Sequence, residues 1–308
     1  MKKVLIVGNG GSSVNPYAKG LYNGKDVFRV NKFFLEPDLL YGRNIKFAVF
    51  PGEPFFIFFM DYLVRNNIYH IDIICYKKLH KRFFLPKVES QMIEWNDYVE
   101  SYKCKDSVPG FYNADQINSK ERYSKITTGP YLINCAIQMG YKDITIIGMD
   151  FYSENSGKKY PIVIPGIWQK ISPFEVPYGS ARINKKKGDS YDQGHSIGVD
   201  IAYVDTLIAN NKDIKFNIYV DEKNTYNNWS KIVKKNQDNV FIHMMENYQS
   251  DSLMSHCLSE IELAIAEYKA QYFWKGRISN AKHLLASRKS VVRKFIYLLR
   301  EKMLNFFD

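Results

Sequence analysis

Short apolar runs bounded by turn residues recur along the first 220 positions of the chain. They are rich in β-branched and aromatic residues and predict strands at 4–7, 26–31, 47–50, 70–76, 143–148 and 215–220. Longer segments between them have helical spacing, most clearly 131–139 and 199–210. Strands that alternate with helices predict an α/β fold with a doubly wound, mostly parallel sheet.

The segment at about 151–196 interrupts this alternation. It contains many glycines and prolines and the basic run 185–187, and it follows neither the helical nor the strand period. A stretch of this length inside a compact domain is either a linker or a functional lid. Its tyrosines and tryptophan fit poorly with a linker, so we expect a lid that becomes ordered over a ligand.

Beyond residue 248 the pattern changes to two predicted helices, at 253–275 and 278–307. The second combines an apolar stripe with many lysines and arginines. Such a helix suits the face of an anionic membrane, and it equally suits packing on its own domain or on another subunit of a homo-oligomer. We therefore expect one domain at 1–248 and a basic helical region at 249–308.

Charge and cysteine content narrow the classes of partner. The 308-residue chain has a formal net charge of +11, which indicates anionic partners such as nucleotides, nucleic acid, glycolipids or a membrane surface. The four cysteines are isolated, which predicts neither a zinc site nor a disulfide framework. No apolar run has spanning length and the first run is too short for a signal peptide, so we expect a cytoplasmic protein.

A glycine-rich turn, "GNGGSS", follows the first predicted strand at 8–13. Such a turn lets the backbone approach a ligand closely, and we expect the amides of the turn to be free for an anion. It is not a dinucleotide fingerprint, because Ser13 replaces the third glycine and the next strand ends in Asn31 instead of an acidic residue. By itself the turn indicates only a nucleotide or a phosphate.

Four later motifs are more specific: "DVFRVN" at 26–31, "ITTG" at 126–129, "GYKDITIIGMDFY" at 140–152 and "GHS" at 194–196. With the glycine turn, in this order and spacing, they resemble the bacterial sialyltransferases of glycosyltransferase family 42, which add sialic acid to lipooligosaccharide. The resemblance covers about 1–245. It implies a Rossmann-like variant of the first glycosyltransferase fold, CMP-sialic acid as the donor, inversion at the anomeric carbon, and no metal or other cofactor.

The resemblance also implies which residues bind the donor. Those that would hold CMP are Gly8, Asn9, Gly10, Asn31, Gly148, Asp150 and Phe151, the last three at the cytidine. Thr127 and Thr128 would contact the sialic acid, whose carboxylate needs hydrogen-bond donors. Because these threonines precede a predicted helix, they could equally form its N-cap.

Three residues would carry out catalysis if the resemblance holds. His195 matches the general base, and the hydroxyls of Tyr152 and Tyr160 match a pair that assists the departing phosphate. Each also has a plainer interpretation, because a histidine between a loop and a helix can be a cap or simply exposed, and the tyrosines can be core or rim aromatics. His195 is the only histidine in a glycine-flanked motif at the end of the predicted lid.

The chain lacks a strict Asp-x-Asp metal clamp. The nearest approach is Glu36-Pro37-Asp38, which follows an aromatic segment at 33–35 that we expect at the surface. Because CMP leaves with one phosphate, hydroxyls, amides and a cation can stabilise it without Mg²⁺.

Three positions depart from the family pattern and bear on donor and acceptor choice. Pro51 lies where an asparagine is common, and Asp192 lies where a tyrosine is expected. Lys125 replaces an arginine before the "ITTG" motif, which keeps the positive charge but loses the bidentate geometry.

The sequence therefore predicts a metal-independent, inverting sialyltransferase at the inner face of the cytoplasmic membrane. Its acceptor would be a galactose or a sialic acid on a lipid-linked glycan. Two alternatives stay open: transfer of another CMP-activated acid sugar, or nucleotide or nucleic-acid binding without chemistry. The last is disfavoured, because the sequence contains neither clustered aromatics of the RNA-binding type nor a recognition helix.

Overall fold

The computed structural model describes residues 1–31, 33–36, 39–50, 54–76, 92–94, 126–151, 197–233, 238–246 and 263. The chain forms two units, Met1–Ile261 and Glu262–Asp308. All strands and helices named below belong to the first. Apart from Leu263, the predicted C-terminal helices lie outside the described residues, as does the predicted lid after Phe151.

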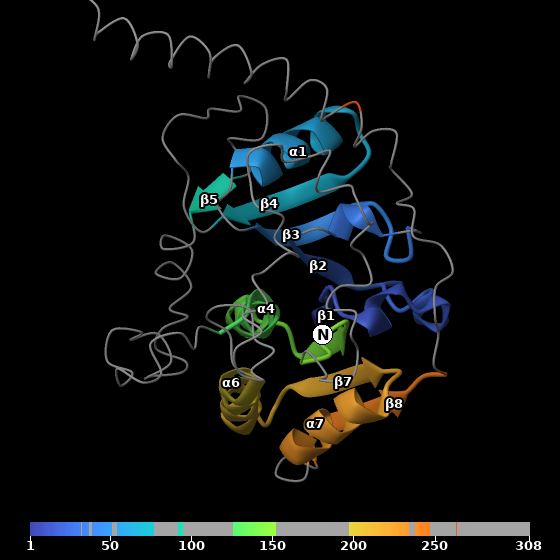
Figure 1. Cartoon of the computed structure of the whole chain (residues 1–308). Helices are drawn as coiled ribbons and strands as arrows, with labels where there is room; N and C mark the ends of the chain where they lie inside the picture. The colour runs from blue at the N-terminus through green and yellow to red at the C-terminus, as the bar shows by residue number, and fades with distance from the viewer. Residues whose placement is uncertain are drawn as a thin grey trace, which may run out of the picture. The chain divides into compact units, whose positions relative to one another are not determined.

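One eight-stranded parallel sheet forms the centre of the first unit (Figure 1). Its strands are β1 (Lys3–Val7), β2 (Asp26–Val30), β3 (Asn44–Phe50), β4 (His70–Tyr76), β5 (Met92–Glu94), β6 (Asp143–Ile147), β7 (Lys215–Val220) and β8 (Val240–Met244). The spatial order is β5-β4-β3-β2-β1-β6-β7-β8, and each neighbouring pair is parallel. The predicted α/β fold class is confirmed.

The direction of strand addition reverses at β1. The chain proceeds from β1 through β2 to β5 along one side, and β6 is later added on the other side of β1. In open parallel sheets, ligands bind beyond the carboxyl ends of the strands at such a reversal. The candidate site is therefore expected beyond the ends of β1 and β6.

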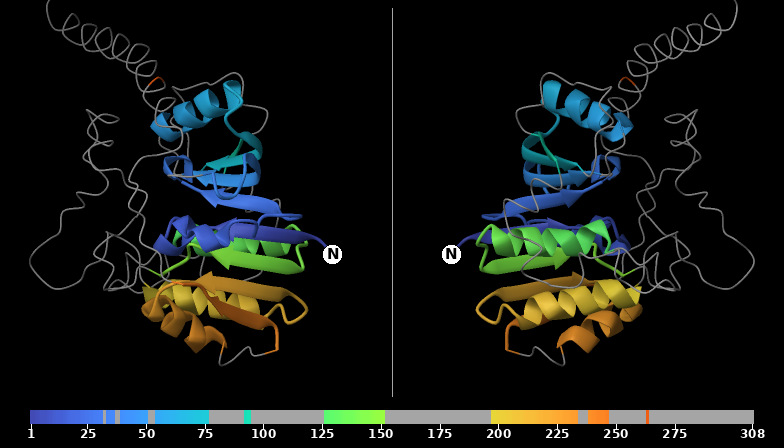
Figure 2. Two further views of the ribbon diagram at one scale, coloured as in Figure 1. Left: turned by 90° about the vertical axis from the view of Figure 1, so that its right-hand side faces the viewer. Right: turned by 90° about the vertical axis from the view of Figure 1, so that its left-hand side faces the viewer.

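The described residues form the helices α1 (Pro54–Arg65), α4 (Thr128–Gln138), α6 (Ile197–Ala209) and α7 (Lys223–Val233). They also form short 3₁₀ turns, η1 (Gly11–Val14), η2 (Pro16–Ala18) and η3 (Phe33–Leu35). Residues of α4, α6 and α7 share one core cluster with the sheet, so these helices cover the same face (Figures 1 and 2). A smaller cluster on the other face includes Ala18 and Tyr41.

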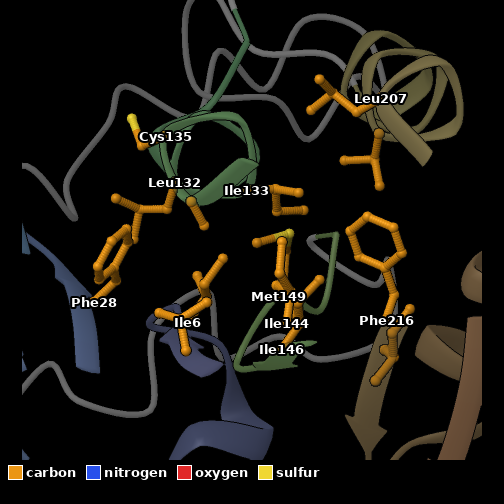
Figure 3. Close-up of a cluster of buried hydrophobic side chains, with 14 of the residues drawn as sticks. Ile6, Phe28, Leu132, Ile133, Cys135, Ile144, Ile146, Met149, Leu207 and Phe216 are labelled. Carbon is orange, nitrogen blue, oxygen red and sulfur yellow. The ribbon is translucent and has the colours of Figure 1, made fainter. Parts of the chain in front are cut away.

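Burial on both faces explains why the central strands are continuous apolar runs. Val4 and Ile6 belong to the cluster under α4, whereas Leu5 and Val7 belong to the cluster on the opposite face. Leu132 of α4 and its neighbours pack over Ile6, Ile144 and Ile146 of β1 and β6, as Figure 3 shows. Uninterrupted apolar strands are typical of parallel sheets covered on both sides.

The aromatic segment at 33–35 is not at the surface as we expected. Phe33 and Phe34 are at most 1% exposed. The reason is a buried ion pair, in which the Arg29 guanidinium donates two hydrogen bonds to Glu36 and lies 5.1 Å from the Phe33 ring centroid. The surrounding apolar and aromatic side chains exclude water from this ion pair, which lies beside the end of β2.

Candidate functional site

The neighbouring parallel strands β1 and β6 are each followed by a glycine, and the backbone segments at these two glycines lie very close together. The Gly8 N–H donates to Ile147 O at 2.8 Å, and the Gly10 N–H donates to Gly148 O at 2.8 Å. A Cβ on Gly8 would lie 2.1 Å from Gly148 O, and Gly148 has φ +70°. The glycine turn is thus required first by the close approach of two backbone segments.

The amides of the turn are largely used inside the protein. In addition to Gly8 and Gly10, the Ser12 N–H donates to Asp150 Oδ2 at 3.0 Å and the Ser13 N–H donates to Gly10 O at 3.0 Å. The prediction that the amides of the turn are free for an anion is therefore wrong for these four groups. These internal hydrogen bonds fix the shape of the turn, and a ligand would contact the surface that the turn presents.

Asp150 folds back over the turn that follows β1. Ser12 Oγ donates to Asp150 Oδ1 at 2.6 Å and accepts from the Gly148 N–H at 2.9 Å. Burial raises the pKa of Asp150 to about 6, although both hydrogen bonds from Ser12 oppose that shift. A carboxylate in this position repels a phosphate and accepts hydrogen bonds from neutral groups such as ribose hydroxyls.

Two buried carboxamide oxygens lie at the same edge. Asn9 Nδ2 donates to Val30 O at 3.1 Å, which joins the turn to the end of β2. Asn9 Oδ1 and Asn31 Oδ1 have no hydrogen-bond partner among the described residues. Asn31 and Phe151 both adopt positive φ, 49° and 48°, at the ends of β2 and β6. Unpaired acceptors and unusual backbone conformations gather at ligand sites.

A third side of the turn is fixed by the ends of β7 and β8. Asn15 Nδ2 donates to Asp221 Oδ2 at 3.1 Å and to Glu246 O at 2.8 Å. The Tyr41 hydroxyl donates to Ser13 O at 2.5 Å. Because the turn is bonded to several strand ends, its shape is set before any ligand arrives.

Helix α7 supports the segment that follows β6. Trp229 Nε1 donates to Met149 O at 3.1 Å, and the Trp229 and Phe151 ring centroids are 4.9 Å apart. Sequence reasoning missed α7 and therefore this support. A signal was present in the single tryptophan among polar residues of "KNTYNNWSKIV".

The threonine motif begins α4 at the same edge of the sheet. Thr127 is the N-cap residue, but its side chain makes no capping hydrogen bond to the helix. Its N–H donates to Asp200 Oδ1 at 2.9 Å and its Oγ1 donates to Asp200 Oδ2 at 2.6 Å. Asp200 lies in the first turn of α6 and was not singled out from the sequence.

The contacts given above bring the predicted residues after β1 and β6 together and join the turn to the end of β2 at Val30. Lys125, Tyr152, Tyr160 and His195 lie outside the described residues. Among the residues that are described, no group of three His, Cys, Asp or Glu side chains is placed to hold a metal ion. No helix in the described ranges is long and apolar enough to cross a membrane.

Comparisons with known proteins identify the family of the chain. No curated protein matches the chain. The sialyltransferase CST-II, solved as a variant in complex with CMP, is 26% identical, with a TM-score of 0.51 over 70% of this chain and 81% of that one. The monofunctional alpha-2,3-sialyltransferase Cst-I from Campylobacter jejuni is 22% identical, with a TM-score of 0.50 over 90% of this chain and 96% of its own, and supports the fold alone. The family model of alpha-2,3-sialyltransferase (CST-I) matches residues 2–256, and the chain therefore belongs to this family of glycosyltransferases.

Proposed function

We propose that this sialyltransferase moves sialic acid from CMP-sialic acid to a glycan hydroxyl, with inversion at the anomeric carbon and without a metal ion. The observation that carries the proposal is a pair of buried carboxamide oxygens, Asn9 Oδ1 after β1 and Asn31 Oδ1 after β2, that have no hydrogen-bond partner among the described residues. A nucleoside offers amino and hydroxyl donors that such oxygens accept. The relative solved with CMP supports a CMP-linked donor.

In this proposal the cytidine, the phosphate and the sialic acid of the donor contact different elements of the fold. Gly8, Gly10 and Gly148 shape the floor, and Asp150 and Phe151 receive the cytidine. The negatively charged phosphate diester of the donor lies away from Asp150, whose carboxylate is held by Ser12. Thr128 contacts the sialic acid carboxylate, and Lys125 supplies a positive charge beside it.

The reaction forms a bond between an acceptor oxygen and the anomeric carbon. The bond from that carbon to the phosphate oxygen breaks, and its electron pair leaves with CMP. His195 takes the proton of the acceptor hydroxyl, which is a poor nucleophile at neutral pH. The hydroxyls of Tyr152 and Tyr160 donate to the departing phosphate, in place of a metal ion.

The acceptor and the cellular location of the enzyme are proposed from the family resemblance and from the segments 151–196 and 249–308. The acceptor is a galactose or a sialic acid of lipooligosaccharide, and the basic region at 249–308 keeps the enzyme at the inner face of the cytoplasmic membrane. The segment 151–196 closes over the donor and excludes water. Transfer of another CMP-activated acid sugar is the second candidate, favoured by the departures at Pro51, Lys125 and Asp192.

A donor panel scored by CMP release tests this function. CMP-sialic acid should be consumed faster when a galactose-terminated acceptor is added, and no turnover of any CMP-sugar would contradict enzymatic function. His195→Ala should lower turnover about 10²- to 10⁴-fold while CMP affinity changes little. His70→Ala, at the exposed first residue of β4, is the matched control and should leave turnover unchanged.

The pH profile gives a second readout of the base. If neutral His195 is active, the rate should rise with pH through a histidine-like value of about 6.5. A His195→Ala protein with near-normal transfer would remove this residue from the mechanism.

A further inference from the structure

We propose that Asp200 is a positioning residue of the donor-sugar site, where it orients the Thr127–Thr128 turn and joins it to α6. This inference rests on the proposed function, because it assumes that the turn contacts the sugar of the donor. Asp200 belongs to a different element from every donor-binding residue predicted above. It would act on the donor through Thr127.

The geometry is a two-point hydrogen bond in a buried place. Each carboxylate oxygen of Asp200 accepts one hydrogen bond from Thr127, from the N–H at 2.9 Å and from Oγ1 at 2.6 Å. Asp200 is 1% exposed and Thr127 is 8% exposed. Two bonds to one residue fix the orientation of that residue as well as its position.

The same two bonds decide which threonine can serve the donor. Thr127 has only two donor groups, and both point to Asp200. A sugar carboxylate needs donors, so it must use the Thr128 hydroxyl and the amides of the first turn of α4, which lack intrahelical partners. Asp200 therefore leaves Thr127 no donor for the sugar carboxylate and holds Thr128 in place.

Asp200 also links two helices that begin at the same edge. α4 and α6 lie side by side in Figure 1, and α6 begins at Ile197, two residues after His195 in the sequence. A carboxylate in the first turn of α6 is favoured by the positive end of that helix. The bond from Asp200 to Thr127 thus connects the sugar-binding turn with the element next to the proposed base.

A second bond between the same helices supplies the matched control. Asn134 Nδ2 donates to the Tyr203 hydroxyl at 2.9 Å, at a buried point further along both helices. Tyr203→Phe removes this bond and keeps the ring, whose centroid is 5.9 Å from that of Tyr131. The variant therefore loosens the helix pair without touching the Thr127 turn.

Charge and geometry predict opposite effects for Asp200→Asn. The donor carries negative charge on its phosphate and its carboxylate, so the loss of a nearby negative charge would by itself lower KM for the donor. Loss of one acceptor from Thr127 would instead displace the turn and raise KM, because an amide nitrogen cannot accept a hydrogen bond. A lower KM for the donor would therefore indicate a purely electrostatic effect of Asp200, and a higher KM would indicate that Asp200 positions the turn.

The experiment compares four variants of the full chain for CMP-sialic acid kinetics and for CMP affinity. Asp200→Asn and Thr127→Val should lower kcat/KM for CMP-sialic acid by about 10- to 30-fold, mainly by raising KM. Thr127→Ser, which keeps both donors, and Tyr203→Phe should stay within about twofold of wild type. The Kd for CMP alone should change less than about twofold in all four, because CMP lacks the sugar.

Several results would overturn the inference. These are equal effects of Asp200→Asn and Tyr203→Phe, a lower KM in Asp200→Asn, or a loss of CMP affinity that parallels the loss of kcat/KM. If Asp200→Asn fails to fold, the Thr127→Val and Thr127→Ser pair decides alone. A wild-type chain that does not turn over CMP-sialic acid would instead refute the proposed function, and this inference with it.

Discussion

Replacing Gly8 with alanine should be among the most damaging single changes in the described part of the chain. The added methyl would lie 2.1 Å from Gly148 O and 2.8 Å from Gly148 C, both of them backbone atoms. Neither can move without opening the contact between the ends of β1 and β6. The two hydrogen bonds between these segments, from the Gly8 N–H to Ile147 O and from the Gly10 N–H to Gly148 O, would lengthen together.

The expected loss can be worked out from these contacts. Forced overpacking costs about 1–3 kcal/mol, and each weakened hydrogen bond costs about 0.5–1.5 kcal/mol. The free energy of unfolding should therefore fall by about 2–6 kcal/mol, a large share of the 5–15 kcal/mol typical of folded proteins. Urea denaturation followed by far-ultraviolet circular dichroism measures this difference.

Gly11 is the matched control in the same turn. A Cβ there would lie 3.7 Å from Asp150 Oδ2, at ordinary contact distance. Gly11→Ala should leave the stability unchanged or raise it by about 0.4–1 kcal/mol, because alanine has fewer unfolded conformations. If Gly8→Ala is within about 1 kcal/mol of Gly11→Ala, the close approach of the two backbones does not explain the glycine.

Four further predictions concern charge, metal ions and the membrane. Glu36→Leu alone should lower the free energy of unfolding by about 3–5 kcal/mol, because it leaves Arg29 buried and unpaired. The double variant Arg29→Met with Glu36→Leu should lose much less of this free energy, as measured by urea denaturation. Equal losses in the two variants would argue against a stabilising role of the ion pair. Because burial holds the pKa of Asp150 at about 6 in the folded protein, against about 3.9 when unfolded, the folded state binds more protons between these values. Stability should therefore fall as pH rises from about 4 to 6, and Asp150→Asn should remove up to about 2–3 kcal/mol of this dependence, measured by urea denaturation across that range; an unchanged slope would contradict it. Transfer should survive EDTA; loss of activity that Mg²⁺ or Mn²⁺ restores would refute the metal-free mechanism. Deletion of 278–307 should weaken sedimentation with anionic vesicles and spare transfer to a small soluble acceptor, whereas retained vesicle binding would favour a packing role for that segment.

Strands were predictable both where burial on both faces leaves a continuous apolar run, as in β1 and β6, and where apolar and polar residues alternate, as in β7. The predicted bounds of β4 and β7 agree with the structure, and those of β1, β2 and β6 differ by one residue. α1 was missed because its sequence, "PFFIFFMDYLVR", is apolar almost throughout, and a short apolar run can be either a strand or a helix. α7 was missed for the opposite reason, because most of its residues are polar.

The candidate site was predictable only as far as local motifs reach. The glycine turn and the "GMDF" segment could be recognised in the sequence, but not that Gly8 and Gly148 meet each other. Asp200 could not be assigned because its partner, Thr127, lies 73 residues away. Its one sequence signal is an acidic residue inside the apolar run "IGVDIAYV", a place where a carboxylate needs a specific partner.

The position of β1 between β2 and β6 has a consequence for biosynthesis. Val4 pairs with Asp26, 22 residues away, and with Ile144, 140 residues away. Loop closure over the longer span costs about 1.6 kcal/mol more by the logarithmic dependence on loop length. On the ribosome, β1 and β2 can pair long before β6 is made, so the donor site forms at a late junction between two halves of the sheet. A bound nucleotide would stabilise that junction, by RT ln(1 + [L]/Kd), and cellular CMP-sugar would then help newly made chains to complete their fold.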